Sequence, residues 1–290
     1  MTTLSHFRRD DGKGCGPVTI LILVCLLSKM GSGHAQSLPP SLQVEFEGGV
    51  AAVQAGRLDE AEKAFLHVLR GGGKVSFVYN NLGIVYQMRG DQKRAIAQFR
   101  EAISLQPDYA APRTLLGASL LALGQDEEAA RELERAVKLQ PDEPLARVQL
   151  ARAYKRTGNY AGRVEQYQAL YSLQPKNPEF LYQLGRAYSD QTEWCLREIR
   201  RIDPNSACLY ETLGENYRLQ GHLDLAVSAY QRALSAEPKR PGIHFALAQI
   251  YLRQGNTPEA RKEINEELAI VPESVVARAL AKKLSAQGPN

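Results

Sequence analysis

Reactive and metal-binding side chains are scarce in this 290-residue sequence, which has four cysteines, five histidines and one tryptophan. An enzyme needs several reactive groups that converge on one place, and no two histidines here are spaced as metal ligands. The sequence also has no nucleophile elbow and no recognisable pairing of a nucleophile with a base. We therefore expect no catalytic residues, no metal site and no cofactor.

A phosphate-binding loop is absent as well, although the run Gly71-Gly72-Gly73-Lys74 is similar to one in composition. Such a loop begins with a glycine at the position that Val68 occupies here, and its lysine is followed by serine or threonine, where this chain has Val75. We interpret the run as a flexible linker and expect a loose junction between two helical segments.

The sequence has no strong excess of charge of one sign. It contains 36 basic and 32 acidic residues, a formal net charge of +4. Residues 1–35 contribute four of the basic and two of the acidic side chains, so the rest of the chain carries only +2. Because such a small charge gives little attraction for phosphate groups, we expect no nucleic-acid partner.

Only one long apolar run occurs, the ten residues Val18–Leu27. A membrane-spanning helix needs about 20 apolar residues, so we expect no permanent span. Basic residues precede the run, and Gly33 and Ala35 follow it at the spacing that signal peptidases recognise. Residues 1–35 are therefore predicted to be an export signal cleaved after Ala35, with an uncleaved anchor as the alternative. The mature protein would be periplasmic or secreted, and residues 36–41 would form a linker.

Repetition is the dominant feature of the rest of the chain. A small residue recurs within helical segments at steps of 34, 34, 34, 34, 29 and 34 residues, and turn glycines and unit-ending prolines keep phase with it. The small residues are Gly49, Gly83, Gly117, Ala151, Gly185, Gly214 and Ala248. The turn glycines are Gly56, Gly90, Gly124, Gly158, Gly221 and Gly255, and the prolines are Pro107, Pro141, Pro175, Pro204, Pro238 and Pro272. Glycine ends the first helix of a unit and proline the second.

Two segments carry a family resemblance: YNNLGIVYQMRGDQKRAIAQFREAISLQP (79–107) and LYETLGENYRLQGHLDLAVSAYQRALSAEP (209–238) closely resemble the tetratricopeptide repeat. The resemblance implies an all-α, right-handed solenoid of about seven antiparallel helix pairs. The predicted repeats are 42–75, 76–109, 110–143, 144–177, 178–206, 207–240 and 241–274. Residues 275–290 would form a capping helix and tail, with Val276, Leu280 and Leu284 on the packed face.

Two repeats depart from the pattern. In the fourth, Arg163 stands where a small residue is expected, which predicts poor packing of its two helices. The fifth is five residues short and lacks the turn, so its helices either fuse or join by a tight bend. This repeat holds Trp194, which we expect in the core, and Cys195. We expect Cys195 to pack as a small residue and not to pair with Cys208 within one chain.

The resemblance also implies a concave groove, lined by the first helix of each repeat, that takes a protein or peptide partner. In repeats one to three the groove positions are mostly apolar and include Val50, Val53, Ile84, Met88, Ala118 and Leu121. In repeats four to seven they include Arg152, Lys155, Arg156, Arg186, Arg218 and Arg253, with Asp190, Glu211 and Glu215 interleaved. The alternative is an ordinary solvated face. The asparagines of a carboxylate clamp are absent.

These features predict a non-catalytic interaction scaffold or adaptor that is exported to the cell envelope. Two alternatives remain: a structural assembly factor of an envelope machine, and a recognition subunit for a separate enzyme. The sequence does not specify the oligomeric state.

Overall fold

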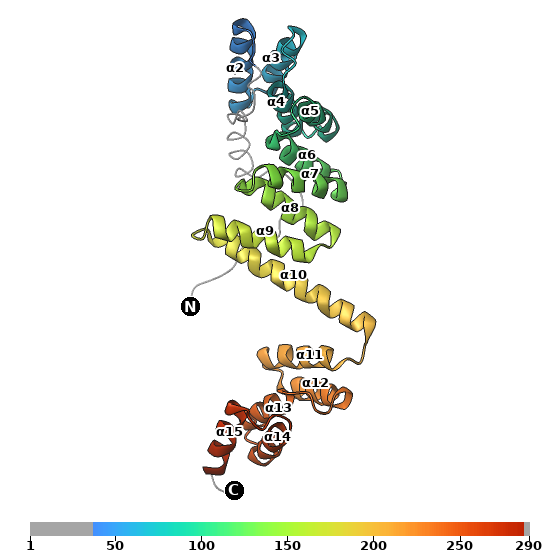
Figure 1. Ribbon diagram of the computed structural model, residues 1–290, viewed down its shortest axis with the longest axis vertical. Helices are drawn as coiled ribbons and strands as arrows, with labels where there is room; N and C mark the ends of the chain where they lie inside the picture. Colours follow the sequence, from blue (N-terminus) through green and yellow to red (C-terminus); the bar gives the residue numbers. More distant parts are fainter. Residues whose placement is uncertain (1–36, 287–290) are drawn as a thin grey trace. The chain divides into compact units, whose positions relative to one another are not determined.

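The computed structural model describes residues 37–286, and every regular element among them is an α-helix. In chain order the helices are α2 (Pro40–Gln54), α3 (Leu58–Arg70), α4 (Ser76–Met88), α5 (Gln92–Leu105), α6 (Ala110–Ala122), α7 (Asp126–Leu139), α8 (Pro144–Thr157), α9 (Tyr160–Leu173), α10 (Pro178–Ile202), α11 (Ala207–Leu219), α12 (Leu223–Ala236), α13 (Ile243–Arg253), α14 (Thr257–Ile270) and α15 (Val275–Ala286). Figure 1 shows that successive helices form hairpins. The predicted all-α solenoid of helix pairs is therefore confirmed.

The chain divides into two compact units, residues 1–189 and 190–290, and the boundary falls within α10. In the N-terminal unit the pairs are α2/α3, α4/α5, α6/α7 and α8/α9, followed by the first half of α10. In the C-terminal unit the second half of α10 precedes the pairs α11/α12 and α13/α14 and the single helix α15.

The turns between paired helices are made as the sequence predicts. All six turn glycines have φ between +73° and +81°, a conformation that a side chain would strain. Beyond the turn, the Asp91 carboxylate accepts a hydrogen bond from the Arg94 amide at 3.1 Å and caps the start of α5. Asn159 caps α9 in the same way through the Gly162 amide.

Within each intact pair, a small residue of the first helix faces a large residue of the second. A Cβ atom built at Gly83 would lie 2.6 Å from the Phe99 ring, and one at Gly117 would lie 2.4 Å from Leu133 Cγ. The side chains of Phe99 and Leu133 are 0% exposed. The missing Cβ thus lets the two helices approach, which is why the period of small residues marks the repeat so clearly.

The junction at Gly71-Gly72-Gly73 is closely packed, so the expectation of a loose linker is wrong. The Gly73 amide donates a hydrogen bond to the Val68 carbonyl at 2.9 Å. A Cβ at Gly73 would lie 2.6 Å from Val68 and 2.8 Å from Leu38. Glycine is needed here because neighbouring side chains occupy the space that a larger residue would fill.

Arg163 does not disrupt the fourth repeat, so the prediction of poor packing is also wrong. Its side chain is 4% exposed, and its guanidinium lies over the Tyr167 ring, 5.5 Å from the centroid. The long aliphatic stem fills the place of the small residue, while the charged end gains a favourable contact with the aromatic face.

The fifth repeat is one continuous helix of 25 residues, α10, so of the two alternatives for its helices fusion is what occurs. Trp194 is 41% exposed, and the expectation that it lies in the core is wrong. Cys195 and Cys208 are both free and exposed, so they do not pack as small core residues. A fused helix has no second helix of its own repeat facing it, which is why Trp194 and Cys195 are exposed.

The two ends of the described chain also differ in detail from expectation. Helix α2 begins at Pro40, two residues before the predicted first repeat, because proline suits the first turn of a helix. Helix α15 packs through Ala277 and Leu284, which are buried, whereas Val276 is 60% exposed and does not belong to the packed face.

Among residues 37–286 no helix combines the length and apolar composition that a membrane crossing requires. The predicted signal, its cleavage point after Ala35 and the mature terminus at Gln36 lie outside the described residues.

Candidate functional site

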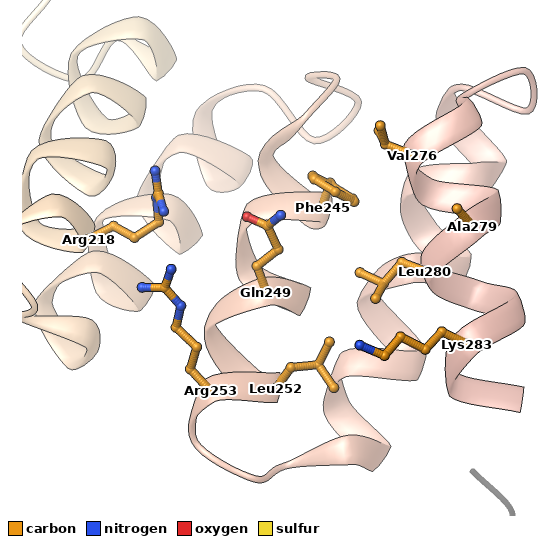
Figure 2. A pocket seen from close by; sticks show the side chains of 9 residues that line it. All are labelled: Arg218, Phe245, Gln249, Leu252, Arg253, Val276, Ala279, Leu280 and Lys283. Carbon is orange, nitrogen blue, oxygen red and sulfur yellow. The ribbon is translucent and has the colours of Figure 1, made fainter. Parts of the chain in front are cut away.

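The C-terminal unit has an open pocket of about 570 Å³, which we call the C-terminal pocket. It is lined by Arg218 from α11; Phe245, Gln249, Leu252 and Arg253 from α13; and Val276, Ala279, Leu280 and Lys283 from α15. Figure 2 shows these side chains pointing into one space between the helices. Two of the predicted groove residues, Arg218 and Arg253, therefore come together here.

Helix periodicity explains the composition of the pocket. Phe245, Gln249 and Arg253 follow one another at intervals of four residues, so they share one face of α13. Val276, Leu280 and Lys283 are spaced by four and three residues and share one face of α15. Each helix thus presents an apolar residue near its start and a basic residue near its end.

The apolar lining is anchored on the core of the unit. Phe245, Leu252 and Leu280 are half-buried and pack against a buried cluster that includes Ala248 and Ile264. These three side chains are consequently held in place, while their remaining surface is open to a ligand. Val276 extends the apolar surface on α15.

Arg218 is neutralised by a carboxylate of its own helix. Its Nε donates to Glu215 Oε2 at 2.8 Å and its Nη2 to Glu215 Oε1 at 2.5 Å. The Tyr230 hydroxyl donates a further hydrogen bond to Glu215 Oε2 at 3.0 Å. The hydrogen bonds from Arg218 and then Tyr230 lower the pKa of Glu215, and the carboxylate in turn raises the pKa of Arg218. Arg218 therefore contributes shape and hydrogen-bond donors more than net charge.

Arg253 and Lys283 supply the net charge of the pocket. Neither forms an ion pair or a side-chain hydrogen bond with any residue in the described part of the chain. Both side chains belong to exposed residues at the same end of the pocket (Figure 2). The pocket thus combines a fixed apolar surface with two positive charges that have no counter-ion among residues 37–286.

The other predicted basic residues lie in the N-terminal unit. Arg156 has partners within its own unit. Its Nε lies 2.9 Å from Asp126 Oδ1, and its Nη1 donates a hydrogen bond to the Leu121 carbonyl at 2.7 Å. Arg152, Lys155 and Arg186 are exposed. The six predicted basic residues are thus divided between the two units, and a binding role for those in the N-terminal unit stays a prediction.

The predicted apolar groove residues of the N-terminal unit are mostly covered. Ile84 is 0% and Leu121 is 3% exposed, and both belong to the core cluster of this unit. Val50 is half-buried, and Met88 is 36% exposed. This burial differs from the open apolar surface that the sequence suggested, and a binding role for these residues stays a prediction.

Sequence reasoning missed the contribution of α15 to the pocket. Gln249 and Leu252 follow Ala248 by one and four residues, so the positional rule that found Arg253 also covers them. That rule could not identify Lys283 and Val276. It counts from the small residue of each repeat, and α15 has no small residue in phase with the repeats.

Stacked helix pairs define a helical-repeat protein. Three family models, each described as a tetratricopeptide repeat, match residues 46–110, residues 87–146 and 217–284, and residues 144–187. Together these ranges cover well over half of the chain. The chain therefore belongs to the tetratricopeptide repeat family.

Individual relatives match more narrowly. Cellulose synthase operon protein C is 39% identical over 75 residues in Pseudomonas fluorescens (strain SBW25) and 35% identical over 75 residues in Xanthomonas axonopodis pv. citri (strain 306). Each match covers 26% of this chain but only 6% and 5% of the relatives. A tetratricopeptide repeat protein of known structure from Parabacteroides merdae matches with a TM-score of 0.47 and 17% identity, covering 85% of this chain and 100% of that chain.

Proposed function

We propose that this protein is a non-catalytic adaptor that binds a protein segment in the C-terminal pocket. The observation that carries the proposal is the combination of unpaired Arg253 and Lys283 with the apolar side chains of Phe245, Leu252 and Leu280. The segment that fits best has an apolar side chain close to one or two carboxylates. Membership of the tetratricopeptide repeat family supports a protein ligand.

The expected affinity is modest. Burial of apolar surface contributes about 25 cal/mol per Å², and exposed ion pairs add only about 0.2–1 kcal/mol each. Part of this gain is offset by the ordering of a flexible segment. The carboxylates would act mainly by selecting and orienting the ligand, and their contribution would fall as salt is added.

The test uses short synthetic peptides that carry leucine and glutamate, with matched peptides in which lysine replaces glutamate or serine replaces leucine. Binding is measured by fluorescence anisotropy with the full chain. The leucine–glutamate peptide should bind more tightly than both matched peptides. The double variant Arg253→Glu with Lys283→Glu should weaken that binding by about tenfold or more, a change of about 1.4 kcal/mol.

The matched control is Lys262→Glu with Lys282→Glu, which makes the same change of net charge at exposed residues that do not line the pocket. This control should bind as the parent does. If the two double variants lose affinity equally, the effect is one of overall charge and the pocket is not the site. If no peptide prefers the parent, the proposed ligand class is wrong.

We also propose that the protein acts outside the cytoplasm, after cleavage of residues 1–35. The support is the apolar run Val18–Leu27 followed by Gly33 and Ala35. N-terminal sequencing of the exported protein should begin at Gln36, and retention of residues 1–30 would replace cleavage with an anchor. The match to the relatives named for a cellulose synthase operon spans only 75 residues, so they suggest no more specific role.

A further inference from the structure

The first half of α10 has a helix face around Gly185 that no second helix of the same repeat covers. In the intact repeats, a Cβ built on Gly49, Gly83, Gly117 or Gly214 would lie within 3.0 Å of a side chain from the paired helix. At Gly185, the equivalent residue of the fifth repeat, nothing lies within 4 Å. On either side of it, Leu181 is 53% and Tyr188 is 45% exposed.

The opposite face of this half-helix is packed in the usual way. Ala187 is 0% exposed and lies in a cluster with Val164 and Leu170 of α9, against which Phe180 and Leu184 also pack. The Gln168 side chain donates a hydrogen bond to the Tyr188 hydroxyl at 2.6 Å. The face around Gly185, by contrast, has nothing packed against it at that residue.

The second half of α10 keeps the residues that such a second helix needs. Counted back from the unit-ending proline, Leu196 stands eight residues before Pro204, as Leu133 stands before Pro141. By the same count Thr192 takes the place of Ala129. A small residue and a large residue four positions apart are thus retained, although the turn before them has been lost.

The two halves also match at a further pair of positions. One position lies four residues before the small residue of the first helix, and the other lies nine residues before the unit-ending proline. In three intact repeats the side chains at these positions are hydrogen-bonded: Arg113 with Glu132 at 2.6 Å, Arg147 with Gln166 at 2.9 Å and His244 with Glu263 at 2.6 Å. In the fifth repeat these positions hold Leu181 and Cys195. Polar side chains have been replaced on both sides by apolar ones, so the contact surfaces remain complementary.

These complementary residues cannot meet within one chain. Along a helix that rises 1.5 Å per residue, Gly185 and Leu196 are separated by about 16 Å, and Leu181 and Cys195 by about 21 Å. The helix runs unbroken from Pro178 to Ile202, and the fifth repeat is too short to hold a turn. A second helix that covers Gly185 would therefore have to come from another molecule.

We propose that a second copy of this chain supplies it, through antiparallel pairing of the two α10 helices. Residues 190–202 of each copy cover Leu181, Gly185 and Tyr188 of the other, and the two-fold symmetry satisfies both open faces at once. Shortening the turn of a helix hairpin is a known physical route to such an exchange, because the contact surfaces survive while closure within one chain becomes impossible.

The first test is a cross-link. In a Cys208→Ser background, Leu181→Cys should form a disulfide with native Cys195 of the other copy when the full chain is mildly oxidised. Mass spectrometry should find the 181–195 peptide link in a covalent dimer. The control is Arg186→Cys, because Arg186 is exposed and lies five residues after Leu181, about 140° further round the helix. Equal cross-linking in the control, or none in Leu181→Cys, would overturn the proposal.

The second test restores the turn. Inserting a copy of residues 89–93 after Asp190 returns the fifth repeat to 34 residues, so Leu196 can fold back onto Gly185 of its own chain. Light scattering after size exclusion should show a dimer for the parent and a monomer for the insertion. Gly185→Phe should keep the helix content of the parent and raise the dimer dissociation constant at least tenfold. A parent chain that is monomeric refutes the proposal, and this is the result expected if an unrelated helical protein is the true partner. An insertion variant that stays dimeric refutes it as well.

Discussion

Gly117 and Gly185 occupy the same position in two repeats, and their surroundings differ completely. At Gly117 the side chain of Leu133 fills the space that a Cβ would need, at 2.4 Å. At Gly185 that space is open. The repeats α6/α7 and α10 thus share a first helix of the same design but differ in whether a second helix folds back onto it.

The difference shows that a motif residue has no fixed energetic value. The glycine of a tetratricopeptide repeat allows close packing only if the second helix is present. Without that helix, the same glycine is an exposed residue in a helix interior, where it costs about 0.5–1 kcal/mol relative to alanine. The contribution of each motif residue must be judged from its contacts.

The largest difference is expected for the large residues of the two second helices. Leu133 is 0% exposed, so Leu133→Ala should lower the free energy of unfolding by about 2–5 kcal/mol through lost burial and a cavity. Leu196 is only half-buried, and Leu196→Ala should cost about 1 kcal/mol or less. Urea denaturation of dilute protein measures both. An equal loss of unfolding free energy in the two variants would mean that Leu196 is more deeply buried than it is in the structure.

Overpacking the two glycines should give the next largest contrast. Gly117→Phe places a ring where Leu133 already lies and should cost about 1–3 kcal/mol. Gly185→Phe meets open space and should leave thermal unfolding of dilute protein nearly unchanged. Each variant serves as the control of the other, because the substitution and the repeat position are the same. An unchanged melting temperature for Gly117→Phe would contradict the packing of α6 on α7.

Much of this comparison follows from the sequence, and part of it does not. The positive φ of Gly56 or Gly124 could be predicted, because a turn between helices needs a residue without a Cβ. The sequence could not distinguish fusion of the two helices of the fifth repeat from a tight bend between them, since a repeat that is five residues short is compatible with both. The choice depends on the helix propensity of residues 189–192 and on long-range packing, which a local pattern does not contain.

The candidate site was only partly predictable for a related reason. Arg218 and Arg253 follow from the repeat register, whereas Lys283 lies on a helix outside that register. The ion pair between Arg156 and Asp126, by contrast, could have been predicted from the spacing of the two residues. Asp126 precedes Arg156 by the same interval at which Asp59 precedes its own partner, Arg89, in the second repeat. Ion pairs that recur with the repeat period can be found from sequence, but single contacts of an irregular helix cannot.

The smallest expected effect concerns the two cysteines of the C-terminal unit, and it distinguishes an open α10 from a covered one. Both thiols are free and exposed, and Cys195 lies seven residues before the end of α10, about 10 Å along the axis. No link between Cys195 and Cys208 within one chain should therefore form, since a disulfide needs Cα atoms within about 7 Å.

In dilute protein, a maleimide reagent should modify Cys195 and Cys208 at similar rates, and neither Cys195→Ser nor Cys208→Ser should change the free energy of unfolding by more than about 0.5 kcal/mol. The two sites should diverge as the protein concentration rises. Pairing of α10 helices covers Cys195 with Leu181 of the second copy, so its labelling should slow, whereas Cys208 on α11 should keep its rate. Mass spectrometry of the labelled peptides measures both rates in one sample. Labelling rates that remain equal at every protein concentration would show that α10 stays uncovered in solution. The fifth repeat would then differ from its neighbours at all concentrations.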